Sequence, residues 1–237
     1  APEELERSAV LPFLDTDVVT GSVFRPQVGY LRPREMALEF VERARDEGVV
    51  FHDHTAVTDL TVEDGVLSGL SVDGEWRPAD DVISAAGPWN PRIAAMAGVD
   101  LPVKHTLAPV LELEPSEPIP YTLPWITHRE SGFSIRRNVD GRVLMTNHPP
   151  GGYEEATEYD PDSVDASFPP DLRSRGLEVL ASLLPTVETF DVVDERVGIR
   201  SSTPDTNPIV GWTSVEGFSV AAFSTSGTQL APATGKV

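Results

Sequence analysis

The sequence contains no cysteine among its 237 residues. A disulfide framework, thiolate-bound zinc or iron–sulfur centres and a cysteine nucleophile are therefore excluded. No apolar run reaches the roughly 18 residues of a membrane-spanning helix, and no basic-then-apolar start indicates a signal peptide. We therefore expect a cytoplasmic protein with no transmembrane segment.

Lysine is scarce and acidic residues dominate the charge. Only Lys104 and Lys236 accompany the arginines, and 18 Lys+Arg face 38 Asp+Glu for a net charge of −20. Nucleic acids and anionic membranes repel such a polyanion, so we expect no nucleic-acid partner. Adaptation to high salt, where screening weakens self-repulsion, is a slightly better explanation than a GC-rich genome that favours arginine.

The first hundred residues predict a helix followed by a β-meander. Pro33 suits the first turn of a helix and Gly48 suits its end. Asp64-Gly65 and Asp73-Gly74 are tight-turn signals between β-prone runs. The expected elements are a helix at 34–47, strands at 56–62, 66–72 and 76–78, a buried strand at 81–87 that ends in small residues, and a helix at 91–97.

The rest of the chain predicts a second sheet and a return to apolar strands. Residues Asn138–Gly141 form a hairpin-turn candidate between two β-prone runs. The expected elements are strands at 106–113, 133–137 and 142–147, a helix at 172–184, strands at 192–199 and 218–223, and a Gly-rich turn before a late helix start.

Three stretches in this order resemble FAD-dependent oxidoreductases of the D-amino-acid oxidase, glycine oxidase and sarcosine oxidase superfamily. The first runs from Gly29–Pro33 through Gly48 to Thr55–Val57, and the second is Val82–Trp89. The third comprises Gly198–Asp205, Asn207–Gly211, Ser226-Gly227 and Leu230–Gly235. The resemblance covers about residues 20–235.

The resemblance implies a fold of the α/β plus α+β class. It consists of an incomplete FAD-binding, Rossmann-like domain with an inserted antiparallel-sheet substrate domain. We expect residues 1–103 and 198–237 to form the FAD-binding part, and residues 104–197 to form the substrate sheet. No G-x-G-x-x-G follows a strand, although that turn holds the FAD pyrophosphate in the family. We therefore interpret the chain as the middle and late part of a longer enzyme.

The family reaction oxidises the C–N bond of a small amino acid or N-alkyl glycine by hydride transfer to the flavin. Since FAD carries the redox chemistry, the resemblance implies no catalytic side chain, and the expected partner is a small amine or amino acid. Two alternatives stay open. One is a truncated, non-catalytic fragment without flavin, and the other is a flavin dehydrogenase of a 2-hydroxy acid or glycerol phosphate.

Substrate binding in such an enzyme needs a cation for the carboxylate, and bidentate arginine fits best. Arg200 matches the carboxylate-binding arginine of the glycine oxidase-like pattern, although a surface arginine paired with an acid is the alternative. Arg136 and Ser134 are further candidates on the inserted sheet, although a solvated strand end is the favoured interpretation of Arg136. Arg136 and Arg137 must point to opposite faces of a strand, so at most one faces a pocket. Ser134 stands where related oxidases often carry tyrosine.

Cofactor contacts are implied at two glycine-containing segments. Ala85, Ala86 and Gly87 would let FAD lie against a strand end, and Gly227, Thr228, Gln229 and Leu230 would approach the flavin ring. The alternatives are tight strand–helix packing and an ordinary turn. Val57 would contact the adenine side, although a plain core position is favoured.

Metal binding is not expected. His52 and His54 would share one face of a strand, but the sequence places no third ligand near them. A packed or exposed strand is the favoured interpretation of this pair.

Overall fold

The computed structural model describes residues 29–119, 123–147, 158–163, 168–184, 189–224 and 226–236, together with Gly21, Val23, Arg25, Gln27 and Tyr153. The first twenty residues of the predicted FAD-binding part therefore lie outside the described residues. The fold is of the α/β plus α+β class, with antiparallel sheets beside a mixed sheet that contains a parallel pair.

The chain divides into two compact units. The first contains Leu107–Gly152 and Asp162–Ile199, and the second contains Gly29–Thr106, Tyr153–Pro161 and Arg200–Val237, with the gaps given above. The described positions before Gly29 belong with the first unit. The functions assigned to these parts of the chain stay predictions.

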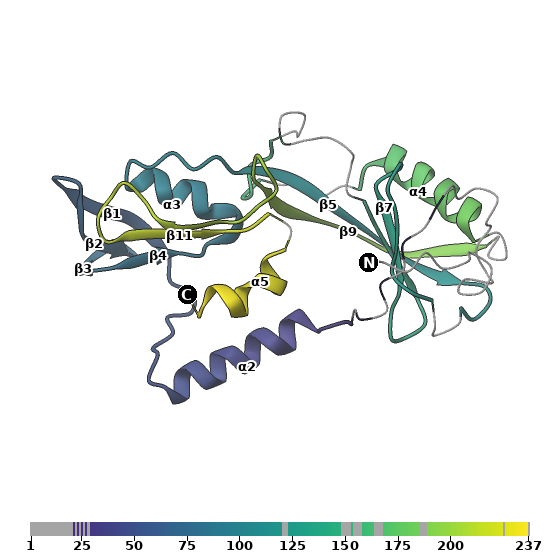
Figure 1. Cartoon of the computed structure of the whole chain (residues 1–237), viewed down its shortest axis with the longest axis horizontal. Coiled ribbons are helices and arrows are strands. Elements are labelled where there is room, and N and C mark those ends of the chain that lie inside the picture. The colour runs from purple at the N-terminus through teal and green to yellow at the C-terminus, as the bar shows by residue number, and fades with distance from the viewer. Residues whose placement is uncertain are drawn as a thin grey trace. The chain divides into compact units, whose positions relative to one another are not determined.

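The second unit begins with a helix and a β-meander (Figure 1). Its first elements are α2 (Pro33–Asp46), β1 (Val57–Glu63), β2 (Val66–Val72) and β3 (Glu75–Pro78). The turn residues Asp64, Gly65, Asp73 and Gly74 all have positive φ. Type I′ turns require this conformation at both central positions, which explains why the Asp-Gly pairs marked these hairpins.

The mixed sheet of the second unit has the order β10-β11-β4 and carries helix α3 on one face (Figure 1). Its elements are β4 (Val82–Ser84), a 3₁₀ turn (Gly87–Trp89), α3 (Asn90–Met96), β10 (Ile209–Trp212), β11 (Phe218–Ala222) and α5 (Gly227–Thr234). Phe218 and Val220 are buried in the core beneath α3, together with Ala94. Ser219 of β11 pairs with Ile83 of β4 on one side and with Trp212 of β10 on the other. Ile83 and Trp212 are 69% and 70% exposed.

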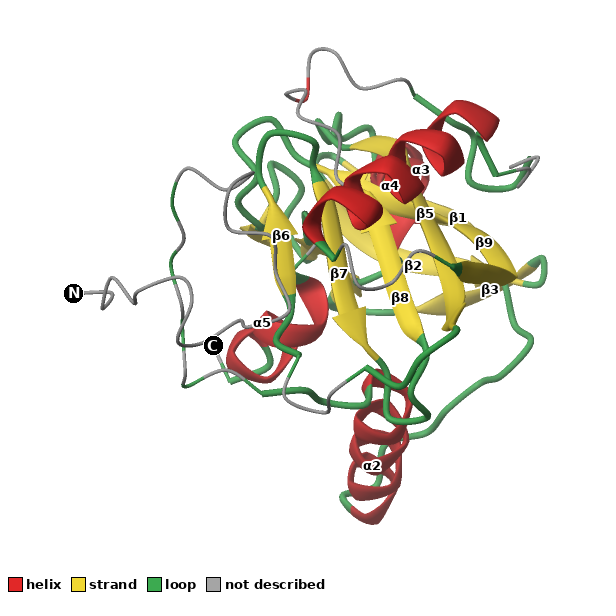
Figure 2. Ribbon diagram, turned by 90° about the vertical axis from the view of Figure 1, so that its right-hand side faces the viewer, coloured by secondary structure: helices red, strands yellow, loops and turns green. Residues whose placement is uncertain are grey.

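The first unit is a five-stranded sheet of order β6-β7-β8-β5-β9 with helix α4 across one face (Figure 2). Its elements are β5 (Lys104–Pro115), β6 (Ile126–His128), β7 (Phe133–Arg137), β8 (Val143–Asn147), α4 (Pro170–Leu183) and β9 (Phe190–Ser202). The boundaries of the two units fall inside β5 and β9. Phe133, Ile135 and Met145 pack against Leu180 of α4 and form the core of this unit.

Two local expectations are wrong. The residues from His52 to His54 do not form a strand, and His54 sits in a turn with φ 56°. His52 and His54 therefore do not share the face of a strand. The strand expected at 81–87 ends at Ser84, because the chain turns into the 3₁₀ segment at Gly87, whose φ is also 56°.

Candidate functional site

The carboxyl ends of two parallel strands define the candidate site in the second unit. Strands β4 and β11 run parallel, with Ser84 beside Val220 in the last pair of their register. Ala85–Gly87 continue from β4 at the same edge where Ala222 and Phe223 leave β11. Ligands of open α/β sheets bind outside the carboxyl ends of parallel strands. Both segments expected to contact the cofactor thus begin at this edge.

Asn90 joins the ends of the two strands. Its Oδ1 accepts hydrogen bonds from Ser84 Oγ at 2.6 Å and from the Ala86 backbone N–H at 3.0 Å. Its Nδ2 donates to the backbone oxygen of Ala221 at 3.1 Å, and the side chain is completely buried. The sequence did not single out Asn90. An Asn before Pro91 at a helix start marks only a local turn, whereas Ala221 lies 131 positions away.

The loop after β4 presents backbone rather than bulky side chains. Ala85 and Gly87 are exposed and Ala86 is half-buried. A Cβ built on Gly87 would meet no atom within 4 Å, so the space beside this residue is open. Small residues at a strand end allow close approach of a flat or phosphate-bearing group, so this loop fits the expected FAD.

The late turn has a packing requirement of its own. A Cβ on Gly227 would lie 3.3 Å from Cβ of Phe223, so the local packing already favours glycine here. Thr228 and Gln229 are exposed and Leu230 is half-buried in the first turn of α5. The Gln229 N–H donates to the backbone oxygen of Ser226 at 3.1 Å, and the N–H groups before it stand at the start of the helix, where they can meet an acceptor.

Val57 lies on β1 and packs against the core of the second unit, together with Leu60 and Leu67. This contact fits the plain core position that the sequence favoured. A contact of Val57 with the adenine side of FAD stays a prediction.

Arg200 lies on the part of β9 that belongs to the second unit, and its side chain is half-buried. Burial lowers the pKa of its guanidinium below the usual value for arginine. Thr106 Oγ1 donates to the backbone oxygen of Arg200 at 3.4 Å and lies 3.3 Å from Ser202 Oγ. Arg200 is thus a cation that is partly withdrawn from water. The hydroxyl of Thr106 fixes its strand through the backbone oxygen of Arg200.

A tight turn follows Arg200. Thr203, 1% exposed, donates from Oγ1 to the backbone oxygen of Asn207 at 2.7 Å. Asp205 accepts hydrogen bonds from the side chain and the backbone of Asn207, at 3.1 and 3.0 Å. These bonds lower the pKa of the Asp205 carboxyl below 3.8. Both polar residues of this motif therefore hold the turn between β9 and β10.

Ser134 and Arg136 lie on the face of β7 opposite the α4 core, whereas Phe133 and Ile135 face that core. The Ser134 Oγ lies 3.0 Å from Thr127 Oγ1, and the residue is 4% exposed. The Arg136 guanidinium lies 5.9 Å from the centre of the Trp125 ring. Both candidates thus share one polar face of the first unit.

Arg137 has a different role from its neighbour. Its Nε donates to the backbone oxygen of Ile119 at 3.0 Å, and Nη1 donates to that of Asn138 at 3.0 Å. Arg137 therefore ties the hairpin to the segment that follows β5. Its position opposite Arg136 agrees with the alternation of side chains along a strand.

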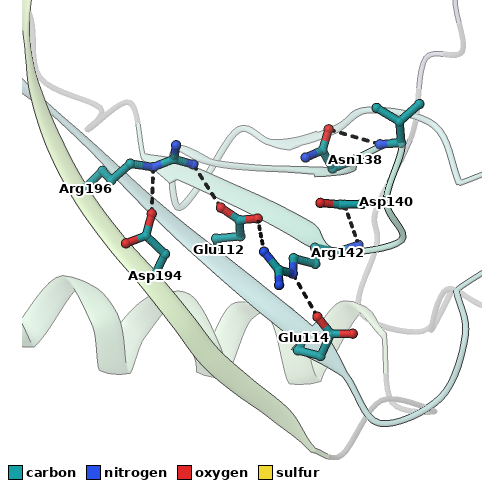
Figure 3. Close-up of polar contacts among 8 residues, drawn as sticks. Glu112, Glu114, Asn138, Asp140, Arg142, Asp194 and Arg196 are labelled. Carbon is teal, nitrogen blue, oxygen red and sulfur yellow. Dashed lines mark hydrogen bonds and ion pairs between the residues drawn. The ribbon is translucent and has the colours of Figure 1, made fainter.

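A chain of ion pairs crosses the sheet of the first unit (Figure 3). Glu112 of β5 accepts from Arg142 at 3.0 Å and from Arg196 at 3.2 Å. Arg142 also contacts Glu114 at 2.9 Å, and Arg196 contacts Asp194 at 3.1 Å. The hydrogen bonds to Glu112 and then Glu114 raise the pKa of Arg142. The sequence did not reveal this network, because its members come from strands β5 and β9 and from the turn that precedes β8.

Two further properties bear on the chemistry. Within the described ranges, no group of three or more His, Asp or Glu side chains is arranged to hold a metal ion. In the same part of the chain, no helix combines the length and the apolar character that crossing a bilayer requires.

Comparison with known proteins identifies the class of protein. The whole chain, residues 1–237, matches the DAO family, described as FAD dependent oxidoreductase. The chain belongs to this family of flavoenzymes. The resemblance seen in the sequence is therefore confirmed at the level of the family.

The chain is also similar to individual enzymes of known name. The chain is 27% identical over 230 residues to 4-methylaminobutanoate oxidase (formaldehyde-forming) of Paenarthrobacter nicotinovorans, covering 92% of this chain and 27% of that protein. It is 23% identical over 230 residues to the mitochondrial dimethylglycine dehydrogenase of Rattus norvegicus, covering 89% of this chain and 25% of that protein. The solved glycine oxidase of Geobacillus kaustophilus has a TM-score of 0.79 at 23% identity, covering 100% of this chain and 61% of that one.

The chain thus spans about a quarter of the length of these two curated relatives and about three fifths of the solved glycine oxidase. The structural likeness shows a shared fold.

Proposed function

We propose that the protein of which this chain is a part oxidises the C–N bond of a small amino acid or N-alkyl glycine, with FAD as its electron acceptor. One observation carries the proposal. The two segments expected to contact FAD leave the carboxyl ends of the paired parallel strands β4 and β11, where nucleotides bind in such sheets. Membership of the DAO family supports it.

The second unit is the part that would hold FAD. FAD, when bound, supplies the two-electron redox chemistry. Ala85 and Gly87 offer accessible backbone at the end of β4. Gly227, Thr228 and Gln229 begin α5, whose first N–H groups carry the positive end of the helix dipole and favour a negatively charged group. Leu230, in the same turn of the helix, is half-buried.

Arg200 is the proposed carboxylate-binding residue. A guanidinium withdrawn from water gains more from an anion than an exposed one does, because the surroundings screen the pair less. Its planar fork also fixes the orientation of a carboxylate through two parallel hydrogen bonds. The substrate class with an amine next to a carboxylate follows from this residue and from the family.

Ser134 and Arg136 are the proposed substrate contacts of the first unit. They lie on the same face of β7, away from the α4 core, where a hydroxyl and a cation can both be presented. Ser134 is nearly buried and its hydroxyl lies beside that of Thr127, so Arg136 is the more accessible of the two candidates. The first unit is the proposed substrate sheet.

Flavin content and anaerobic bleaching test the function. The purified full-length protein, titrated with FAD, is expected to show a structured flavin absorption band, and an N-methyl amino acid added without oxygen is expected to bleach it. A panel of sarcosine, dimethylglycine, proline, glycine, lactate and glycerol 3-phosphate defines the class. Protein that takes up no FAD would contradict the proposal, and bleaching by the two hydroxy compounds alone would contradict the amine assignment.

Arg200→Ala tests the carboxylate role, with Arg196→Ala as the matched control on the same strand. Loss of the buried cation is expected to raise KM by about 30-fold or more. Arg196, with its side chain 56% exposed, belongs to the ion-pair network of the first unit, and its loss is expected to leave KM within about threefold. An unchanged KM in a flavin-loaded Arg200→Ala variant would remove Arg200 from the site.

A further inference from the structure

We infer that Asn90 is a positioning residue of the FAD site, where its side-chain amide replaces one peptide unit between the ends of β4 and β11. The inference rests on the proposed function, because it concerns the loop that would contact FAD. It assigns a role to a residue that touches neither cofactor nor substrate.

The hydrogen bonds of Asn90 continue the ladder of the two parallel strands. Regular pairing stops at Ser84 and Val220. The next carbonyl on β11, that of Ala221, accepts from Asn90 Nδ2 instead of from the backbone that follows β4. On the other side, the Ala86 N–H donates to Asn90 Oδ1. Asn90 thus supplies the acceptor for the Ala86 N–H and the donor for the Ala221 backbone oxygen, two groups that would bond each other if the ladder continued.

Only an amide side chain satisfies both strands in this way. A side-chain amide carries a carbonyl acceptor and N–H donors, as a peptide group does. Asn90 Oδ1 uses its acceptor capacity twice, for Ala86 and for Ser84 Oγ at 2.6 Å. A buried peptide group without a partner is costly, so the strands could not separate here without such a replacement.

Separation of the strands is what makes room for a ligand at this edge. With the Ala86 N–H held by Asn90, the chain turns away from the sheet at Gly87. Ala85 and Gly87 stay exposed beside it. The amide therefore fixes which backbone groups of the loop face the sheet and which remain for the cofactor.

A buried asparagine in the first unit supplies a matched control. Asn147, 4% exposed, donates from Nδ2 to the backbone oxygen of Ser131 at 3.3 Å and belongs to β8. Asn147→Ala and Asn90→Ala both remove a buried amide that bonds a backbone carbonyl. Only Asn90 is hydrogen-bonded to the loop of the proposed FAD site.

The experiment compares wild type, Asn90→Ala, Ser84→Ala and Asn147→Ala by FAD titration, visible flavin spectrum and hydrogen exchange of the apoprotein. Asn90→Ala is expected to weaken FAD binding about tenfold or more and to remove the fine structure of the flavin absorption band. It is also expected to speed hydrogen exchange of the Ala86 amide about tenfold or more. Ser84→Ala, which removes one of the three bonds, is expected to show a smaller change of the same kind and serves if Asn90→Ala does not fold. Asn147→Ala is expected to leave all three readouts near wild type.

The outcomes separate the two proposals. A wild type that binds no FAD contradicts the proposed function, and the positioning role with it. A wild type that binds FAD while Asn90→Ala and Ser84→Ala match its affinity and spectrum contradicts the positioning role alone. Unchanged exchange of the Ala86 amide in both variants contradicts it as well, and so does an equal loss of FAD affinity in Asn147→Ala.

Discussion

Asp205 and Asn207 show how a polar motif near a proposed site can serve the backbone. Asp205 accepts two hydrogen bonds from Asn207, and Thr203 closes the same turn from its other end. The turn fixes where β9 ends, two residues after Arg200. Its stability therefore bears on the placement of Arg200, although neither polar residue needs to contact substrate.

The lowered pKa of Asp205 predicts a pH-dependent contribution to stability. The folded pKa lies below the unfolded value of 3.8, so the stabilisation is complete well above 3.8 and disappears as the pH falls through the folded value. Thermal melts of wild type and Asp205→Ala are expected to differ above about pH 5 and to converge as the pH falls through the folded pKa of Asp205. Asn207→Ala, which removes the side-chain donor but keeps the backbone N–H, is expected to reproduce part of this difference. A difference that persists at the acid end would contradict this account.

The sequence identified some residues of the candidate site and missed others. The small residues Ala85–Gly87 were recognisable because a strand that ends in small residues leaves a local pattern. Gly227 was recognisable too, but its contact with Phe223 supplies a packing reason that the sequence did not show. The role of Asn90 could not be predicted from the sequence, because its hydrogen-bond partner Ala221 lies 131 positions away and comes close only when β4 pairs with β11.

At the scale of elements, helix α4 depends on a close approach to its sheet. Gly176 is buried on the helix face that meets Phe133 and Met145, and a Cβ there would lie 3.0 Å from Cε1 of Phe133 and closer still to the end of the Met145 side chain. Glycine inside a helix normally costs stability relative to alanine, so its presence here reflects packing.

Gly176→Ala is therefore expected to destabilise the first unit by about 1–2 kcal/mol, since overpacking outweighs the gain in helix propensity. Urea denaturation measures the change. Ser174→Ala, at an exposed position of the same helix, is the matched control and is expected to be neutral or slightly stabilising. A Gly176→Ala variant as stable as Ser174→Ala would mean that Phe133 and Met145 can move to accommodate the methyl group with no loss in the free energy of unfolding.

The ion-pair network offers a second contrast on one strand. Glu112, with its side chain 11% exposed, bonds two arginines, whereas Glu114, 54% exposed, bonds one. Glu112→Gln is expected to cost about 1–3 kcal/mol, because it weakens two charge-assisted bonds at a buried position. Glu114→Gln is expected to cost less than about 1 kcal/mol. Chemical denaturation at low and high salt compares them, and equal losses would show that burial does not govern the network.

Elements bounded by turn chemistry were predictable, and elements that need distant partners were not. The meander and the hairpin around Asn138–Gly141 follow from local signals, and the structure has β7 at Phe133–Arg137 as expected. The apolar run Val49–Phe51 forms no strand among the described residues, because β-prone residues need a neighbouring strand with which to pair. Short β6 and β10 carried no distinct pattern of their own.

At the scale of the whole molecule, the charge imbalance is the dominant electrostatic property. A net charge of −20 over 237 residues favours expanded states at low ionic strength, because like charges repel most strongly when the chain is compact. Local ion pairs such as those of Glu112 act in the opposite sense and weaken as salt is added. With 38 acidic and 18 basic residues, unpaired acids outnumber the pairs that salt would weaken.

Salt is therefore expected to stabilise the protein. Raising KCl from about 0.05 to about 1 M shortens the screening length several-fold and is expected to raise Tm by roughly 3–6 °C. A variant with four exposed carboxylates neutralised at Glu42, Asp46, Glu178 and Asp191 is the matched control. It is expected to melt higher than wild type at low salt and to gain less from KCl, because less repulsion remains to be screened. A wild-type Tm that falls with KCl would show that specific ion pairs outweigh the net charge, and it would remove the physical basis for expecting adaptation to high salt.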